Sequence, residues 1–231
     1  MNYKSLEEKY FKFYQEIQYK GQNGYVSNFY HSQMERGLDN HFFQNILEVG
    51  AGGGQHFNFV KSKFNFYKIT DLILPNLIPS VTNKVNQMNK NDIKVSIESQ
   101  NVEQLTYESG TFDRTIVTCV LHHLKNPMQA LEEIRRVTMD GGLISIYLPS
   151  DPGLLYRIAQ MLVSNNSFKN HFSKKELKLL RALEHRNHVS SLLEMIYEIF
   201  ESDELTFRTF PILNFGWNTS LFQIVTIKIR K

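Results

Sequence analysis

The chain has 231 residues, of which 42% are hydrophobic and 21% are charged, and its net charge at neutral pH is +3. This length and hydrophobic content indicate one α/β domain with an elaboration and exclude a disordered chain, while the single cysteine, Cys119, excludes an intrachain disulfide and a cysteine-built metal site. The first residues lack the apolar core of a signal peptide, and no apolar run approaches about 18 residues, so we expect a soluble, cytoplasmic protein without a membrane span.

The N-terminal region predicts helices. Residues 6–17 carry apolar side chains at helical spacing, and Ser5 with Glu8 forms a capping-box pattern in front of them. The sequence GQNG at positions 21–24 predicts a break, after which residues 26–38 predict a second helix.

From residue 45 onward, strand patterns alternate with helical ones. Strands are predicted at residues 45–50, 67–73, 93–99, 112–120 and 141–149, and the clearest helix at residues 126–138. Short continuous apolar runs that alternate with helices are typical of strands buried on both faces. The pattern therefore predicts an α/β fold of the doubly wound kind, in which a parallel sheet carries helices on both sides.

After Pro149 the pattern changes. Helical spacing at residues 154–162 and 191–200, together with a second capping-box pattern from Ser173 and Glu176, predicts a helical insertion over residues 151–201. Two β-like runs, 204–212 and 221–231, follow it. We expect the insertion to be a cap on one domain and not an independent domain.

A glycine-rich turn follows the first predicted strand. Gly50, Gly52 and Gly54 lack Cβ atoms, so the main chain can turn tightly and a ligand can lie directly against it. Asp71 ends the next predicted strand, where a carboxylate can accept hydrogen bonds from both hydroxyls of a ribose. Strand, glycines and acid at this spacing predict an adenosine-like ligand.

Glu48, just before the turn, distinguishes between possible ligands. A carboxylate beside the pyrophosphate of a dinucleotide would repel it, whereas a cationic ligand would be attracted. S-adenosylmethionine carries an ammonium and a sulfonium group, and the spacing G-x-G-x-G also differs from the dinucleotide pattern. The residues around the turn therefore favour S-adenosylmethionine.

Four ordered motifs extend this interpretation: ILEVGAGGG at 46–54, NVEQL at 101–105, FDRTIVTCVLHHL at 112–124 and EEIRRVTMDGGLISIYLP at 132–149. Together they resemble the class I S-adenosylmethionine-dependent methyltransferases of small-molecule type. The resemblance implies a Rossmann-like fold with a seven-stranded, mostly parallel sheet whose last strand is antiparallel, and S-adenosyl-L-methionine as cofactor. Its implied cofactor-binding residues are Glu48, Gly50, Ala51, Gly52, Gly54, Asp71, Leu72, Asn101, Val102, Thr118 and Cys119.

Asn101 departs from the family pattern, which usually has Asp at this position. An amide carbonyl can still accept a hydrogen bond from the adenine amino group, so we expect binding to persist, though more weakly. Cys119 has an alternative interpretation as a small packed hydrophobic residue.

Candidate catalytic residues follow the fourth strand. His122 and His123 are placed at the sheet edge where cofactor and acceptor meet, and the ordinary histidine pKa suits a base near neutrality. The alternative is that one of them caps the next helix while the other packs under the cofactor.

Candidate acceptor-binding residues lie in three segments. They are Tyr30 and His31 before the first strand, Asp151, Tyr156 and Arg157 after the fifth, and His185, Arg186 and His188 in the sequence EHRNH. Surface helix capping is an equal alternative for the last group. Two histidines three residues apart suggest a metal site, but no third ligand is evident in the sequence, so no metal is predicted.

The resemblance also implies that consecutive segments of the chain have different roles. We expect residues 1–40 to form a helical lid, 41–150 the cofactor-binding core, 151–201 the acceptor cap and 202–231 the final strands.

The predicted function is methyl transfer to an oxygen, in preference to a nitrogen, of a small-molecule acceptor. A weaker resemblance to bacterial enzymes that methylate cell-surface sugars suggests a sugar or glycan precursor. The alternatives are a nucleic-acid methyltransferase, which would need a stronger basic face and an Asn/Asp-Pro-Pro-aromatic motif, and an inactive cofactor-binding partner subunit. Nucleic acid is not an expected partner, and the sequence predicts no oligomeric state.

Overall fold

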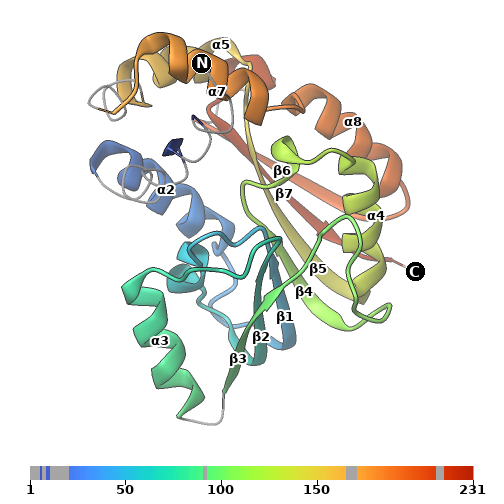
Figure 1. The fold of residues 1–231 in the computed structure, drawn as a ribbon. Helices are drawn as coiled ribbons and strands as arrows, with labels where there is room; N and C mark the ends of the chain where they lie inside the picture. Colours follow the sequence, from blue (N-terminus) through green and yellow to red (C-terminus); the bar gives the residue numbers. More distant parts are fainter. Residues whose placement is uncertain are drawn as a thin grey trace.

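The computed structural model describes residues 6, 9, 10, 21–90, 93–164, 171–211 and 216–230. In this part of the chain, seven strands form one sheet in the order β3-β2-β1-β4-β5-β7-β6 (Figure 1). The strands are β1 (Phe42–Val49), β2 (Lys63–Asp71), β3 (Lys94–Ser99), β4 (Phe112–Val117), β5 (Thr138–Pro149), β6 (Glu204–Phe210) and β7 (Phe222–Lys228). β1 to β5 pair in parallel, and β7 runs antiparallel between β5 and β6. The predicted fold class is confirmed.

Helices cover both faces of the sheet. Figure 1 shows α2 (Gly21–Met34) and α3 (Pro79–Asn89) on one side and α4 (Pro127–Val137) and α8 (Val189–Ile199) on the other. α5 (Leu154–Ala159) and α7 (Lys174–Glu184) lie beyond one end of the sheet. Short helical turns are η1 (Gln55–Phe59), η2 (Leu121–His123), η3 (Gln160–Ser164) and η4 (Trp217–Thr219).

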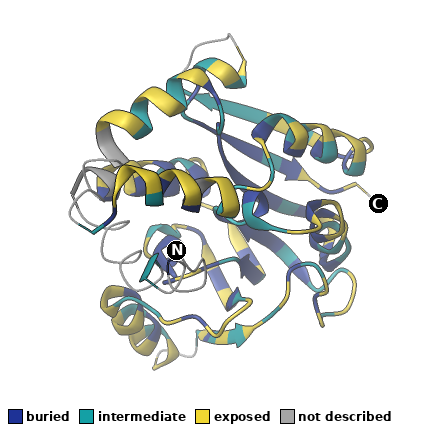
Figure 2. Cartoon of the chain, turned by 45° about the horizontal axis from the view of Figure 1, so that its top comes forward, coloured by how far each residue is buried: buried dark blue, intermediate teal, exposed yellow. Residues whose placement is uncertain are grey.

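The core consists of two apolar layers, one on each face of the sheet. Ile46 and Leu47 are consecutive in β1 and both fully buried, but they belong to opposite layers. A strand covered on both sides needs apolar residues at every position, which is why its sequence reads as a continuous apolar run. Figure 2 shows the resulting contrast between buried strands and helices with exposed outer faces.

α8 belongs to this core. Its residues Val189, Leu192 and Ile196 are buried in the same layer as α4. Within residues 151–201, α8 thus packs on the sheet, whereas α5, η3 and α7 extend beyond it (Figure 1), and the role of this segment as an acceptor cap stays a prediction. An apolar helical stripe has the same sequence pattern whether it covers a sheet or a pocket, so the sequence does not separate the two.

The N-terminal helices differ from the prediction at one boundary. The residues GQNG at 21–24 are helical as part of α2, so the predicted break is wrong. The propensity cost of a glycine in a helix is about 1 kcal/mol, and packing of the buried Tyr30 and Met34 outweighs it. Ser5, Glu8 and most of residues 6–17 lie outside the described residues.

The second predicted capping box is present. Ser173 N donates to Glu176 Oε2 at 2.7 Å, and Glu176 N donates to Ser173 Oγ at 3.2 Å. These reciprocal bonds satisfy two main-chain donors at the start of α7.

A buried ionic cluster fastens α2 to the sheet. Arg114 of β4 and Glu35, just past α2, have fully buried side chains and form a two-pronged ion pair. His56 Nε2 lies 2.9 Å from Glu35 Oε1, and His31 Nδ1 lies 3.0 Å from His56 Nδ1. Burial opposes ionisation of Glu35, but the bond to His56 and the charge of Arg114 prevail and lower its pKa to about 2.

Within the described residues, no helix is both long and apolar enough to cross a membrane.

Candidate functional site

The glycine turn after β1 has the backbone that its sequence predicts. Gly50, Gly52 and Gly54 have φ values of 66°, 54° and 72°, in the left-handed region that favours glycine. A Cβ atom on Gly50 would lie 2.5 Å from Cβ of Val120, and one on Gly54 would lie 2.8 Å from Cδ2 of Leu77. The turn therefore requires glycine both for its dihedral angles and for its close approach to the chain after β4.

Asp71, at the end of β2, holds this turn. Its Oδ2 accepts a hydrogen bond from Gly52 N at 2.8 Å, and its Oδ1 accepts one from Leu72 N at 2.7 Å. Each carboxylate oxygen keeps a second lone pair for a ribose hydroxyl. The side chains of Leu72, Ile73 and Leu74 are largely exposed beside it and offer an apolar surface for a flat ring.

Glu48 lies behind the turn with no exposed surface. Its Oε2 accepts a hydrogen bond from the Tyr67 hydroxyl at 2.7 Å, while Oε1 has no hydrogen-bond partner in the described part of the chain. Burial raises the pKa of Glu48. An orphaned acceptor fits a cofactor ammonium group, but contact needs a bridging water or a small movement of the side chain.

The adenine side of the predicted site is only partly as expected. Asn101 is exposed, and its Oδ1 accepts a hydrogen bond from Glu103 N at 3.0 Å, so one of its two lone pairs is already used. The Val102 side chain is buried in the core, which leaves only its main chain for a ligand.

The segment after β4 forms the neighbouring wall. Thr118 is buried, and Cys119 has a φ of 55°, a left-handed value that no other non-glycine residue in the described ranges adopts. Apolar surroundings raise the pKa of the Cys119 thiol to about 12, so it stays protonated. Ala51 is buried, and its N–H donates to Thr70 O at 3.0 Å, which links the turn to β2.

Near the predicted catalytic residues, hydrogen bonds join the turn after β4 to the turn between α7 and α8. His122 O accepts hydrogen bonds from Arg186 N at 2.9 Å and Asn187 N at 3.1 Å. The Asn187 side chain donates to Leu121 O at 3.0 Å and Leu124 O at 2.8 Å. Sequence reasoning misses Asn187, because an Asn in a polar stretch predicts only a turn.

This junction gathers four of the predicted site residues. The ring centroids of His122 and His123 are 3.9 Å apart, and those of His122 and His185 are 4.8 Å apart. His123 Nδ1 lies 2.9 Å from Glu184 O, and His185 Nδ1 lies 2.6 Å from Asp151 Oδ2. Two segments far apart in the sequence thus form one imidazole cluster.

Two imidazoles of this cluster, those of His122 and His123, lie in surroundings that favour the neutral ring. Burial lowers the pKa of His122 well below its usual value, with His123 and His185 acting in the same direction. Burial and the neighbouring His185 lower the pKa of His123 to about 4. A histidine with so low a pKa is a weak base, so the prediction of His123 as a solitary general base gains no support from its environment.

The remaining predicted acceptor residues are not in the cluster. Tyr156 is half-buried and lies close enough to Tyr147 to interact with it electrostatically, as Cys119 also does. Arg157, Arg186 and His188 are exposed, and Arg186 Nε lies 3.4 Å from Leu183 O.

Tyr30 and His31 pack inside the protein, against the sheet and the ionic cluster. Tyr30 is buried and stacks on Tyr147 with ring centroids 3.9 Å apart, while His31 is buried in the ionic cluster. α2 turns both side chains toward the sheet, and their assignment to the acceptor site stays a prediction.

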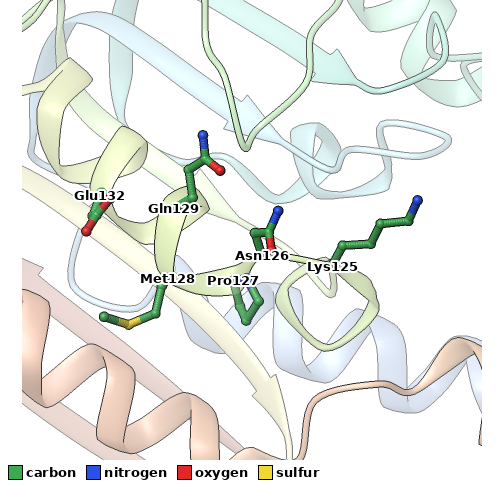
Figure 3. Close-up of a pocket in the computed structure, with 6 residues that line it drawn as sticks. All are labelled: Lys125, Asn126, Pro127, Met128, Gln129 and Glu132. Atoms are coloured by element: carbon green, nitrogen blue, oxygen red, sulfur yellow. The ribbon is translucent and has the colours of Figure 1, made fainter.

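A surface pocket at the start of α4 is not part of this site. Figure 3 shows that its side chains spread outward from a single segment: Lys125, Asn126, Pro127, Met128, Gln129 and Glu132. The main-chain N–H groups of Lys125 and Asn126 already donate to the Glu103 carboxylate at 3.0 and 2.9 Å. The Glu103 carboxylate therefore already occupies the anion-binding position at the N-terminus of α4.

The sheet order, the left-handed glycine turn and the acid at the end of β2 are those of the class I S-adenosylmethionine-dependent methyltransferase fold. More particularly, residues 47–146 match a family described as methyltransferase domain. S-adenosylmethionine is the cofactor of this class, and the glycines, Asp71 and the orphaned Glu48 oxygen fit it.

One curated relative is 28% identical over 129 residues, the hybrid PKS-NRPS synthetase pydA from Acremonium sp. The match covers 54% of this chain and only 3% of the synthetase.

Solved structures show the same fold at low sequence identity. The CurJ carbon methyltransferase is 16% identical with a TM-score of 0.55, and the comparison covers 93% of this chain and 57% of CurJ. YcgJ from Bacillus subtilis is 16% identical with a TM-score of 0.56, covering 87% of this chain and 99% of YcgJ. A possible histamine N-methyltransferase from Thermotoga maritima is 13% identical with a TM-score of 0.51, covering 96% and 98%.

Proposed function

We propose that this chain transfers a methyl group from S-adenosylmethionine to an oxygen atom of a hydroxyl-bearing small molecule, with sugars as the first class to test. The observation that carries the proposal is the imidazole cluster of His122, His123 and His185 at the edge of the sheet that also carries the glycine turn. Val120, which packs against Gly50, lies only two residues from His122, so the two parts of the site are neighbours.

The cofactor supplies a methyl group that is already activated as part of a sulfonium ion. The protein must bind the acceptor, align it and exclude water, and it must take up a proton when the acceptor is a hydroxyl. A neutral amine needs no such proton acceptor before it attacks. A cluster of neutral imidazoles is therefore better suited to an oxygen acceptor than to a nitrogen acceptor.

His185 is the best-oriented imidazole of the cluster. Because Asp151 accepts its Nδ1–H, the lone pair of the neutral ring is fixed on Nε2. The same geometry at Glu184 O leaves the lone pair of His123 on Nε2. The Nε2 lone pair of His185 can take up the proton of a hydroxyl, and that of His123 can accept a hydrogen bond from it.

The test is a methyl-transfer assay with labelled donor and separate pools of small molecules, polysaccharides and nucleic acids. We expect label in hydroxyl-bearing small molecules, and label in nucleic acid alone would contradict the proposal. With an acceptor in hand, His185→Ala should lower kcat by about 10²–10⁴-fold while the cofactor Kd changes little. His41→Ala, at an exposed position before β1, serves as the histidine control.

A further inference from the structure

The three histidines of the cluster are arranged like the ligands of a metal ion, and the sequence does not reveal this arrangement. One ring nitrogen of each of His122, His123 and His185 lies within 4.8 Å of the others. The sequence predicts no metal site, because no third metal ligand is evident close to His185 and His188 in the sequence. The fold supplies it by bringing the turn after β4 against the turn after α7.

The hydrogen bonds around the cluster leave lone pairs for an ion. Carbonyl and carboxylate oxygens can only accept, so Glu184 O fixes the proton of a neutral His123 on Nδ1, and Asp151 does the same for His185. Both rings then keep an unshared lone pair on Nε2. A histidine whose other nitrogen donates to a carbonyl or carboxylate is the usual arrangement of metal-binding histidines.

His122 supplies an independent observation. Its side chain is buried, and its Nδ1 has no hydrogen-bond partner among the described residues. A buried nitrogen without a partner is unfavourable unless another group satisfies it.

We propose that His122, His123 and His185 bind a divalent transition-metal ion, with Zn²⁺ as the best-matched ion and Asp151 as the residue that orients His185. Three imidazoles suit zinc, copper, iron or nickel, whereas calcium and magnesium prefer oxygen ligands. Three protein ligands also leave a coordination position open for an oxygen atom, as in catalytic zinc sites. If the proposed function holds, the acceptor hydroxyl takes that position, and the ion, in place of the free imidazole lone pairs, assists the loss of its proton to water.

The distances allow this with a small adjustment. Zn–N bonds of about 2.0–2.1 Å in a tetrahedral site place ligand nitrogens about 3.4 Å apart, so the largest separation must shrink by about 1–1.5 Å. The side chains of His185 and Asp151 are 18% and 21% exposed, so they can move together toward the two histidines of the other turn.

The test is a zinc titration of untagged, chelator-treated protein against a competing chromophoric chelator, without cofactor or acceptor. We expect one equivalent of Zn²⁺ per chain for the wild type. His185→Ala and His123→Ala should lose this binding, and Asp151→Asn should weaken it by about 10–100-fold. His188→Ala is the matched control, because this exposed histidine precedes α8 outside the cluster and should leave zinc affinity unchanged.

Circular dichroism and S-adenosylmethionine titration of each variant verify that the fold is intact. Less than one equivalent of zinc in the wild type, or wild-type affinity in folded His185→Ala, would overturn the proposal. Because no methyl transfer is measured, this result is independent of the proposed function. A variant that loses zinc but keeps turnover would contradict the proposed role of the cluster and leave the metal site standing.

Discussion

The contact between Gly50 and Val120 allows a quantitative test of how the cofactor turn is built. Gly50→Ala places a residue with a side chain at a φ of 66°, which costs about 1–2 kcal/mol. It also places a Cβ atom 2.5 Å from Cβ of Val120, and overpacking of this kind costs about 1–3 kcal/mol. We therefore expect the variant to lose about 2–5 kcal/mol of unfolding free energy, together with most of its S-adenosylmethionine affinity.

Two further variants separate the backbone cost from the steric cost. Gly37 has a φ of 86° but open space around its Cβ position, so Gly37→Ala should lose only the backbone part, about 1–2 kcal/mol, and should keep cofactor affinity. The double variant Gly50→Ala with Val120→Gly should recover the steric part. Urea denaturation measures stability, and calorimetry measures cofactor Kd. Equal destabilisation by Gly50→Ala and Gly37→Ala would refute the close packing of the turn on Val120.

Three other predictions follow from the described contacts. Asp71→Ala should weaken S-adenosylmethionine binding by about 1.5–3 kcal/mol in calorimetry, and unchanged affinity would exclude Asp71 as the ribose ligand. Glu35→Gln breaks a buried ion pair and should destabilise the protein by about 3–5 kcal/mol in urea, whereas Glu204→Gln, in an exposed pair, should change stability by no more than about 1 kcal/mol. Burial is the largest cause of the lowered pKa of His31 in the folded state, and the neighbouring His56 acts in the same direction. The folded protein therefore favours the neutral ring, and the stability that this ring contributes is complete above pH 6.5 and is lost as the pH falls below that value. His31→Phe should consequently lose less stability than the wild type between pH 7 and pH 5, and parallel losses would contradict the assignment.

The cofactor half of the molecule could be predicted from the sequence because its determinants are local. The glycines, Asp71 and the apolar strands act within a few residues of their own positions, and their dihedral angles and alternation appear directly in the sequence. The parallel order of the sheet also follows from the regular alternation of strands and helices.

The acceptor side could be predicted only as a set of candidates. His122 and His185 are in different turns, and their proximity depends on how α7 and α8 are connected, which no local pattern encodes. Tyr30 and His31 show the converse difficulty. Their helix is evident, but the direction of each side chain depends on which face of α2 meets the sheet.

The hydrogen bond from Val189 N to Asp151 O, 3.0 Å long, joins the two ends of the intervening segment. Residues 152–188 therefore start and end at neighbouring points of the fold. Closing a loop costs an entropy that grows only slowly with its length, so such an excursion can be lengthened, shortened or replaced at little expense to the remaining fold. Chimeras that exchange residues 152–184 and retain His185 and Asn187 would preserve the junction and the sheet. Under the proposed function, a change of acceptor can therefore arise by replacement of one surface excursion, while the strands that bind the cofactor keep their sequence.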